Sequence, residues 1–423
     1  MKKILVVLMA LFFATGAFAQ NAGAKFDYNL WGLAYGAAGS WGSDAKWDYQ
    51  HIRVRPMFTA GNENIKGVVR LQIDEGYGGN DSPGPLSSAA DDAAGPFARN
   101  KAVKVQYAYL QASNLFMQGL SFTTGIAPYD YPLIADTELA LTGVNYDFGM
   151  GNVTLAYAKV NEANRYEKFG SKDNEDVQAY IIDATIKTGV VDIRPALFFI
   201  NAGKEYMLVS TYNKFKVYMG ALNANADMGM FGFDATFAYL KASGKDPAGV
   251  LDKLDTSGYG VDLNINIKPD KGMEIGVFGT YTSGTDGTDP KKANFAGTVA
   301  DLFGGGDTVG KLFLLQRGGT QDFGGVQYLE VWKNDNYGIM AFGISAQYTM
   351  DKLTFFGQFG YVMLAKKYAS GDKAVGTEID VKVSYEVVAK TDLFLEYAFV
   401  MAGDDGVNSE NTQQILWGLK TSI

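Results

Sequence analysis

The sequence contains no cysteine and a single histidine, His51, among its 423 residues. No disulfide can form, and neither thiolates nor a histidine cluster can hold a metal ion. A Ser-His-Asp triad would have only His51 as its base, and we find no Ser or Asp constellation to complete it. The sequence therefore predicts no catalytic residue, no metal site and no cofactor, and it argues against an enzyme.

Long apolar runs and basic tracts are also absent after the first 19 residues. Those residues combine Lys2 and Lys3 with the apolar stretch Ile4–Phe13 and the small residues around Ala19, which is typical of an export signal cleaved before Gln20. The apolar stretch is too short for a membrane-spanning helix. A net charge of −9 without a basic tract argues against nucleic acid as a partner.

Proline is scarce, with 10 residues, and no Pro/Ser-rich linker divides the chain. Instead, 51 Gly, 25 Tyr and 27 Phe are spread evenly along it. We therefore expect residues 20–423 to form a single domain.

A strict alternation of side chains is clearest in Thr377–Met401. Ile379, Val381 and Val383 fall on one side of an extended chain, and Glu378 and Asp380 fall on the other. Because successive side chains of a strand point to opposite faces, this stretch predicts a hairpin with one apolar and one ionic face.

The same alternation recurs along the whole chain after the export signal. Short turns, such as those at 149–152 and 351–352, alternate with long connections, such as those at 76–100 and 282–336. Outer-membrane β-barrels combine short periplasmic turns with long external loops in this way. Lipid offers no hydrogen bonds, so a spanning sheet must close on itself. We predict an all-β, transmembrane antiparallel β-barrel of about 18 strands, with 16 or 20 as alternatives; Tyr206–Tyr212 is assigned to an external loop to keep the count even.

The export signal, alternating hairpins and final strand together resemble a Gram-negative outer-membrane porin. Val105–Leu110, followed by Leu120–Ile126 with its Thr-Thr-Gly, is similar to a hairpin of substrate-diffusion channels. The chain ends in Trp417–Ile423, where a terminal Ile replaces the aromatic residue usual in porins. The resemblance implies an outer-membrane location, contact with lipid and lipopolysaccharide, and a homotrimer.

If the apolar faces meet lipid, the ionic faces line a lumen, and 16–18 strands suffice for a water-filled one. His51 is expected on this lining. In Ala102–Ala112, Tyr107 and Tyr109 are expected on the apolar face, opposite Lys104 and Gln106. The early strands supply a basic lining and the late strands an acidic one. The basic residues are Arg53, Arg55, Lys66, Arg70 and Lys104, and the acidic residues are Asp262, Glu274, Glu378, Asp380, Glu386 and Glu396.

In a closed barrel we expect the basic and acidic walls to lie roughly across from each other, creating a transverse field that orients solutes. The alternative is that every inner face is polar and the clustering is chance. The connection at 282–336 contains apolar residues, including Leu312–Leu315, which need burial. It is expected either to fold into the lumen as a constriction or to pack on a neighbouring subunit.

These patterns predict a porin for passive diffusion of small hydrophilic solutes, with some preference for anionic ones. The alternative is a surface structural or adhesive barrel whose lumen is blocked and whose external loops bind a partner.

Overall fold

Period-2 alternation gives rise to 18 strands in the described residues. The structure is a computed structural model and describes residues 25–41, 45–77, 102–161, 177–202, 213–245, 254–285, 295, 311–315, 337–367, 371, 373–403 and 410–423. The strands are β1 (Lys25–Trp41), β2 (Ala45–Gly61), β3 (Ile65–Tyr77), β4 (Ala102–Ser113), β5 (Leu120–Tyr131), β6 (Ala135–Asp147), β7 (Gly151–Asn161), β8 (Val177–Lys187), β9 (Asp192–Ala202), β10 (Asn213–Asp227), β11 (Phe231–Lys245), β12 (Leu254–Asp270), β13 (Met273–Thr282), β14 (Ile339–Met350), β15 (Leu353–Leu364), β16 (Ala374–Val388), β17 (Thr391–Ala402) and β18 (Thr412–Ser422). Nothing in these ranges is a helix long and apolar enough to cross a bilayer.

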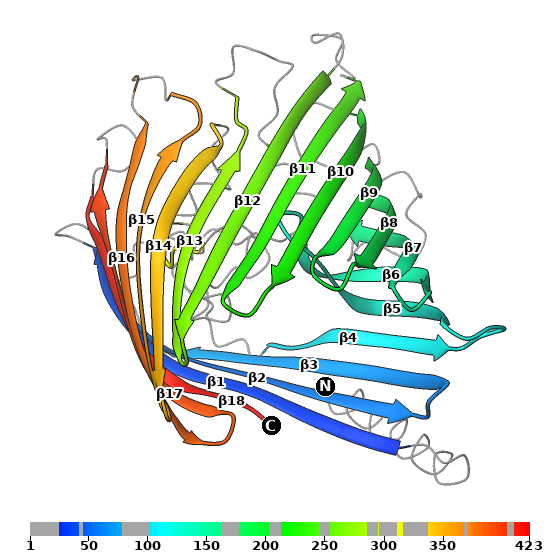
Figure 1. Ribbon diagram of the computed structural model, residues 1–423, viewed down its shortest axis with the longest axis horizontal. Helices are drawn as coiled ribbons and strands as arrows, with labels where there is room; N and C mark the ends of the chain where they lie inside the picture. The colour runs from blue at the N-terminus through cyan, green and yellow to red at the C-terminus, as the bar shows by residue number, and fades with distance from the viewer. Residues whose placement is uncertain are drawn as a thin grey trace.

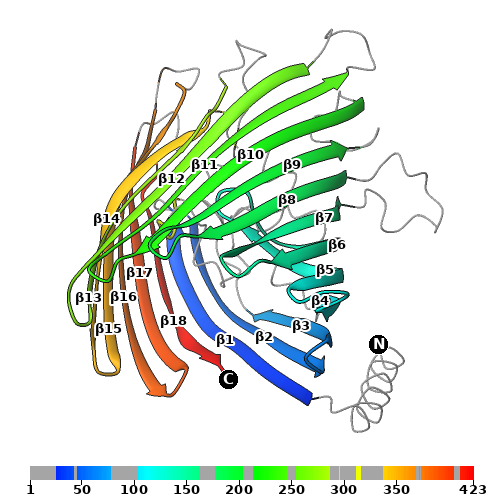
Figure 2. The same cartoon turned by 45° about the vertical axis from the view of Figure 1, so that its right-hand side comes forward.

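Each strand pairs antiparallel with its neighbours in the sequence, and the sheet closes where β1 pairs with β18. Figure 1 shows the resulting barrel, and Figure 2 shows it from a second side. Closure leaves no free margin along the two terminal strands, as lipid demands. The prediction of an 18-stranded antiparallel barrel is confirmed. The export signal and Tyr206–Tyr212 lie outside the described residues.

The hairpin of β16 and β17 has the two faces that its sequence predicts. Val381 and Tyr385 on β16 and Leu395 on β17 point outward and are 47–49% exposed. Glu378 and Glu396 point inward and are buried. Exposed large apolar side chains recur on the outward face of the other strands, so an apolar belt surrounds the barrel. Such a belt suits the hydrocarbon interior of a membrane.

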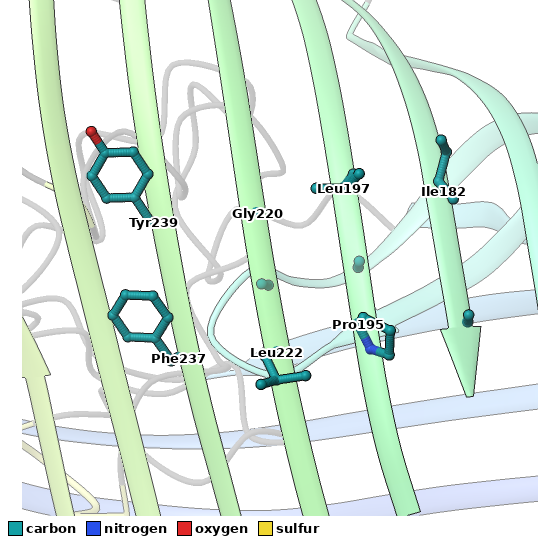
Figure 3. Close-up of a pocket in the computed structure, with 10 residues that line it drawn as sticks. Ile182, Pro195, Leu197, Gly220, Leu222, Phe237 and Tyr239 are labelled. Carbon is teal, nitrogen blue, oxygen red and sulfur yellow. The ribbon is translucent and has the colours of Figure 1, made fainter. Parts of the chain in front are cut away.

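A shallow apolar depression interrupts this belt on the outer face of β8–β11, with a volume of about 560 Å³ (Figure 3). It forms at Gly220, which has no side chain to fill the space between its larger neighbours. Those neighbours are Ile182, Pro195, Leu197, Leu222, Phe237 and Tyr239.

Two strands depart from the predicted assignment of faces. In β4 a bulge at Gln106 shifts the register against β3 between Arg70 and Leu71, so that Val105 pairs with Leu71 and Tyr107 with Arg70. The prediction that Tyr107 and Tyr109 share the outward face of Val105 is therefore wrong. One extra residue in a strand moves every following side chain to the other face.

In β1, by contrast, the alternation is regular but inverted. Leu33 and Tyr35 are apolar, yet they point inward and are only 2% and 4% exposed. An apolar face therefore does not by itself identify the lipid side of this barrel.

The hairpin of β5 and β6 leaves the wall half-way along its length. β5 pairs with β4 only from Ser121 to Ile126, and β6 pairs with β7 only from Ala140 onward. Beyond these points, residues 127–139 pair only with each other and turn into the barrel interior, as Figures 1 and 2 both show. We call residues 127–139 the inner hairpin tip.

Gly125 lies where β5 separates from β4, with a φ of 125°, a conformation open mainly to glycine. A Cβ added there would lie 2.3 Å from the Ala108 carbonyl oxygen. We expect Gly125→Ala to lower the free energy of unfolding by about 1–3 kcal/mol, measured by urea titration in detergent micelles. Gly189→Ala is the matched control, because Gly189 also has a positive φ of 90° but nothing within 4 Å of an added Cβ. Equal losses in the two variants would contradict the steric argument.

The inner hairpin tip packs on the inward face of β7–β11, the strands that follow it in the sheet. Its Tyr131 and Ile134 are fully buried, in one apolar cluster with Ile181, Phe198 and Leu240 of β8, β9 and β11. Phe295, from the connection between β13 and β14, belongs to the same cluster. A second cluster joins Leu312–Leu315 of that connection to the inner faces of β13–β17. The barrel interior thus contains two packed apolar clusters.

Candidate channel lining

The inner faces of β2 and β3 bring three of the predicted basic residues together. Arg53 and Arg55 are neighbours on one face of β2, with Arg53 opposite Asp74 of β3. Arg55 Nε donates to Gln72 Oε1 at 2.8 Å. Arg70 Nη1 donates to the Tyr107 hydroxyl at 3.0 Å, and its guanidinium lies 5.0 Å from the centre of the same ring.

A tryptophan on β1 extends this basic wall to the last strand. The guanidinium of Arg55 lies 4.8 Å from the centre of the Trp31 ring, and Lys420 Nζ of β18 lies 5.8 Å from it. Cations over an aromatic face are attracted by its quadrupole. Lys420 therefore belongs to the basic wall, although the sequence analysis did not include it. Lys420 could have been found from the sequence, because it follows the apolar Leu419 in the alternating pattern of the final strand.

The other two predicted basic residues lie at the margins of this wall. Lys66 is exposed at the start of β3 and lines a polar pocket of about 640 Å³ together with Lys25, Asp27 and Glu63. Lys104 lies on β4 opposite Gln72 of β3, and its side chain is outside the described part. His51 is on the inner face of β2, 6% exposed, with its ring centre 5.3 Å from that of Tyr35.

Two predicted acidic residues lie on the inner faces of β12 and β13. Asp262 Oδ1 accepts from the Thr280 hydroxyl at 2.5 Å, and its Oδ2 accepts from Asn264 Nδ2 at 2.7 Å. Glu274 is half-buried and opposite Gln347 of β14. Asp262 is thus held by hydrogen bonds on two sides.

Three more predicted acidic residues are buried in the wall instead of facing open water, and two of them, Glu378 and Asp380, hold the long connection to it. Glu378 and Asp380 are 0% exposed and Glu396 is 1% exposed. Glu378 accepts from the backbone N–H groups of Leu314 and Leu315, both at 2.7 Å, through its two oxygens. Asp380 Oδ2 accepts from the N–H of Phe313 at 3.3 Å. The expectation that these carboxylates line an open channel needs this correction.

Glu378 and Asp380 hold residues 311–315, and we call these residues the latched segment. Gln358 of β15 donates to the Lys311 carbonyl at 2.9 Å and to Asp380 Oδ2 at 2.6 Å. Leu312, Leu314 and Leu315 are fully or almost fully buried. Burial strengthens hydrogen bonds to charged acceptors, so the segment is fixed by both polar and apolar contacts.

Around the same wall, Glu396 lies 3.5 Å from Lys382 Nζ, and Lys382 Nζ lies 5.4 Å from the centre of the Phe394 ring. Glu386, the sixth predicted acidic residue, lies near the turn between β16 and β17. Its Oε1 accepts from the Lys390 N–H at 3.0 Å.

A buried ion pair that the sequence analysis missed holds the inner hairpin tip. Arg194 of β9 contacts both oxygens of Asp183 on β8, with its Nη2 2.6 Å from Asp183 Oδ2. The same Nη2 donates to the Asp130 carbonyl at 2.8 Å, and the Tyr131 hydroxyl donates to the Arg194 carbonyl. The signal in the sequence was that Asp183 is the one acid of β8 and Arg194 the one base of β9, both within otherwise largely apolar strands.

The strand order changes how the two charged walls face each other. Glu378, Asp380 and Glu396 lie on β16 and β17. Going round the barrel from β17, only β18 and β1 come before β2. β12 and β13, which carry Asp262 and Glu274, are about half the barrel away from β3 and β4. The expectation of one acidic wall across from the basic wall is therefore wrong for β16 and β17. Those two strands are near neighbours of the basic wall.

No family model matches this chain, and no curated protein matches it in sequence. Its fold is nevertheless similar to that of several solved outer-membrane proteins. OpdK of Pseudomonas aeruginosa is 9% identical, with 94% of this chain and 98% of that chain covered and a TM-score of 0.56. OccAB4 of Acinetobacter baumannii is 11% identical, with the same coverage and a TM-score of 0.57. OccK8 (OprE) of P. aeruginosa is 11% identical, again with the same coverage, and its TM-score is 0.56. The chain therefore has the 18-stranded barrel fold of these outer-membrane proteins.

Proposed function

We propose that this chain is an outer-membrane porin, a water-filled channel for passive diffusion of small polar or ionic solutes, with a preference for anionic ones. The observation that carries the proposal is a closed 18-stranded barrel with an apolar belt outside and paired charges inside. A barrel of this size is wide enough to conduct water. The fold shared with outer-membrane proteins supports the same reading.

The mechanism follows from which parts of the inner wall are covered. The inner hairpin tip covers β7–β11, and the latched segment covers β13–β17. The connection at 282–336, which contains the latched segment, then acts as a constriction. Arg53, Arg55 and Arg70 lie on the remaining side, so a solute passes along the basic wall. A cleft lined by charge of one sign attracts the opposite charge, which favours anions.

The likeness to a known ligand complex agrees with this preference. A solved structure of P. aeruginosa OpdK with vanillate is 10% identical to this chain, with a TM-score of 0.55. Vanillate carries a carboxylate, the kind of group that a guanidinium binds well. We therefore include carboxylated solutes among those proposed to pass through this channel.

The proposed location follows from the same reading. Residues 1–19 act as an export signal cleaved before Gln20, and residues 20–423 form one domain in the outer membrane of a Gram-negative cell. Lipid and lipopolysaccharide surround the apolar belt. In a homotrimer, part of that belt would be buried between copies.

Planar-bilayer recording tests both conduction and ionic preference. We expect discrete ohmic steps and a reversal potential of anionic sign in a KCl gradient. Replacing Arg53, Arg55 and Arg70 by Ser should lower the chloride-to-potassium permeability ratio by about two- to fivefold, because three cations leave the pathway. The control removes the same charge from the short turns, with Lys271, Lys352 and Lys390 replaced by Ser, and should leave the ratio unchanged.

An unchanged ratio in the arginine variant would contradict the anionic preference. A correctly folded barrel that gives no conductance would contradict the channel itself. That result would favour a surface structural or adhesive barrel that binds a partner through its external loops.

A further inference from the structure

The departure of the inner hairpin tip leaves a seam in the barrel wall. Residues 102–107 of β4 pair with β3 on one side, but none of the described strands pairs with their other side. The facing residues, 127–131 of β5, pair only with β6. In a continuous wall this part of β4 would pair with β5 along its whole length.

The seam lies at the level of the apolar belt. Val105, within the unpaired part of β4, points outward and is 45% exposed. Ile73 of β3, the strand that pairs with this part of β4, is 38% exposed. Leu110, where pairing with β5 has resumed, is 59% exposed. Backbone without partners is tolerated at membrane depth only where it is buried in protein or lines a water-filled cavity. The unpaired margin of β4 therefore needs either protein cover or water from the lumen at this level, and none of the described strands covers it.

One side-chain bridge spans the seam where backbone bonds are missing. Gln106, the bulge residue of β4, donates from Nε2 to Glu138 Oε1 of the inner hairpin tip at 2.5 Å. The other atom of that amide, Gln106 Oε1, is buried and accepts no hydrogen bond from the residues that the structure describes. A single side-chain bond between flexible groups is far easier to open than a ladder of backbone bonds.

The two sides of the seam differ in chemistry. On the outer side, Val105 and Leu110 present apolar surface to the surroundings. On the inner side, Arg70 lies against Tyr107, one residue from the bridge. A molecule with an apolar body and one anionic group would match both sides at once, with its charge on Arg70 and its body along Val105 and Leu110.

From this arrangement we propose that the seam is a lateral portal, closed by the Gln106–Glu138 bridge, through which amphiphilic organic acids pass between the lumen and the surrounding lipid. The portal adds a sideways exit to the proposed axial channel and rests on that proposed function for a wet lumen. It needs no displacement of the inner hairpin tip, which Arg194 and the apolar cluster hold in place.

The absence of cysteine allows a clean test by cross-linking. In the double variant Gln106→Cys/Glu138→Cys, a short bis-methanethiosulfonate reagent joins the two thiols across the gap that the longer native side chains fill. The protein is placed in vesicles with an outer leaflet of lipopolysaccharide, which slows direct entry of the probe. The probe is pyrenebutyrate, whose fluorescence reports its arrival in lipid. We expect cross-linking to lower the protein-dependent transfer rate by about tenfold, because the link removes the open state, and reduction to restore it.

The matched control is Asn223→Cys/Asp234→Cys, joined by the same reagent, which links β10 to β11 in a continuous part of the wall, where the native side chains are 2.9 Å apart. Its cross-linking should leave transfer unchanged. Transfer that persists at the same rate in the cross-linked seam variant, or that falls equally in the control, overturns the portal.

Conductance of the same proteins separates this proposal from the axial channel. Wild-type protein without conductance would reject the channel, whereas normal conductance with transfer unaffected by the cross-link rejects the portal alone. A second variant, Gln106→Ala, does not depend on cross-linking. It should raise the transfer rate by about threefold at unchanged conductance, because the hydrogen bond that holds the portal closed is gone. No rise in transfer would overturn the portal.

Discussion

Replacing Glu378 and Asp380 together by Ala should give the channel a second, higher conductance level. If the latched segment stayed in place, three buried N–H groups would lose their acceptors, at about 1–3 kcal/mol each. If it left the wall, Leu312, Leu314 and Leu315 would be exposed, at roughly 1.5–3 kcal/mol each. The two costs are similar, so we expect both positions to be populated.

Single-channel recording measures this outcome directly as switching between two current levels. The conservative variant Glu378→Gln retains Oε1 as an acceptor for Leu314 but turns an amide NH2 towards the Leu315 N–H, so it should populate the second level less often than the double alanine variant does. Glu386→Ala is the control, because Glu386 lies on the same strand but bonds only to the neighbouring turn. One unchanged level in the double alanine variant would show that the carboxylates do not position the segment.

Arg194→Ala should produce the largest loss of stability among single substitutions in the wall. It leaves Asp183, whose side chain is 9% exposed, without its cation, and it removes the bond to the Asp130 carbonyl. Breaking a buried pair by removing one partner costs roughly 3–5 kcal/mol, and we expect the lower end here because the Arg194 side chain is 27% exposed. The loss is measured as the change in free energy of unfolding in urea, with the barrel in detergent micelles.

The control for this loss is an exposed ion pair in the same barrel. Lys241 and Asp255 lie 3.3 Å apart with side chains 54% and 64% exposed. Lys241→Ala should therefore change the free energy of unfolding by no more than about 1 kcal/mol. Adding Asp183→Asn to Arg194→Ala should recover part of the loss, because the unpaired charge is gone. Similar losses for Arg194→Ala and Lys241→Ala would contradict the account.

Much of the fold could be predicted from the sequence because the period of two is a local property. Thr377–Met401 shows why: its outward and inward residues separate cleanly, and the barrel follows once many such segments need closure. The prediction of which face a side chain occupies failed in β4, where one inserted residue shifts the alternation. The bulge at Gln106 is visible only in the register between β3 and β4, so the face of Tyr107 could not be read from alternation.

The lining could be predicted in part. Arg53, Arg55 and Arg70 share neighbouring strands close in the sequence, so their grouping was readable. The role of Glu378 was not, because its partners Leu314 and Leu315 are about 60 residues away in a connection without periodicity. An inner face that packs on an inserted hairpin carries apolar residues, as Phe198 does, and its pattern then resembles a lipid-facing one.

The pairing of β1 with β18 implies an order of assembly. Those strands come from opposite ends of the chain, so the backbone hydrogen bonds between them cannot form until synthesis and export of the whole protein are finished. The inner hairpin tip and the latched segment pack on β7–β11 and β13–β17, which all precede β18 in the chain. Both can therefore pack while the sheet is still open, and only the pairing of β1 with β18 must wait for the end of the chain. Non-local pairing of this kind is slow in any β-protein.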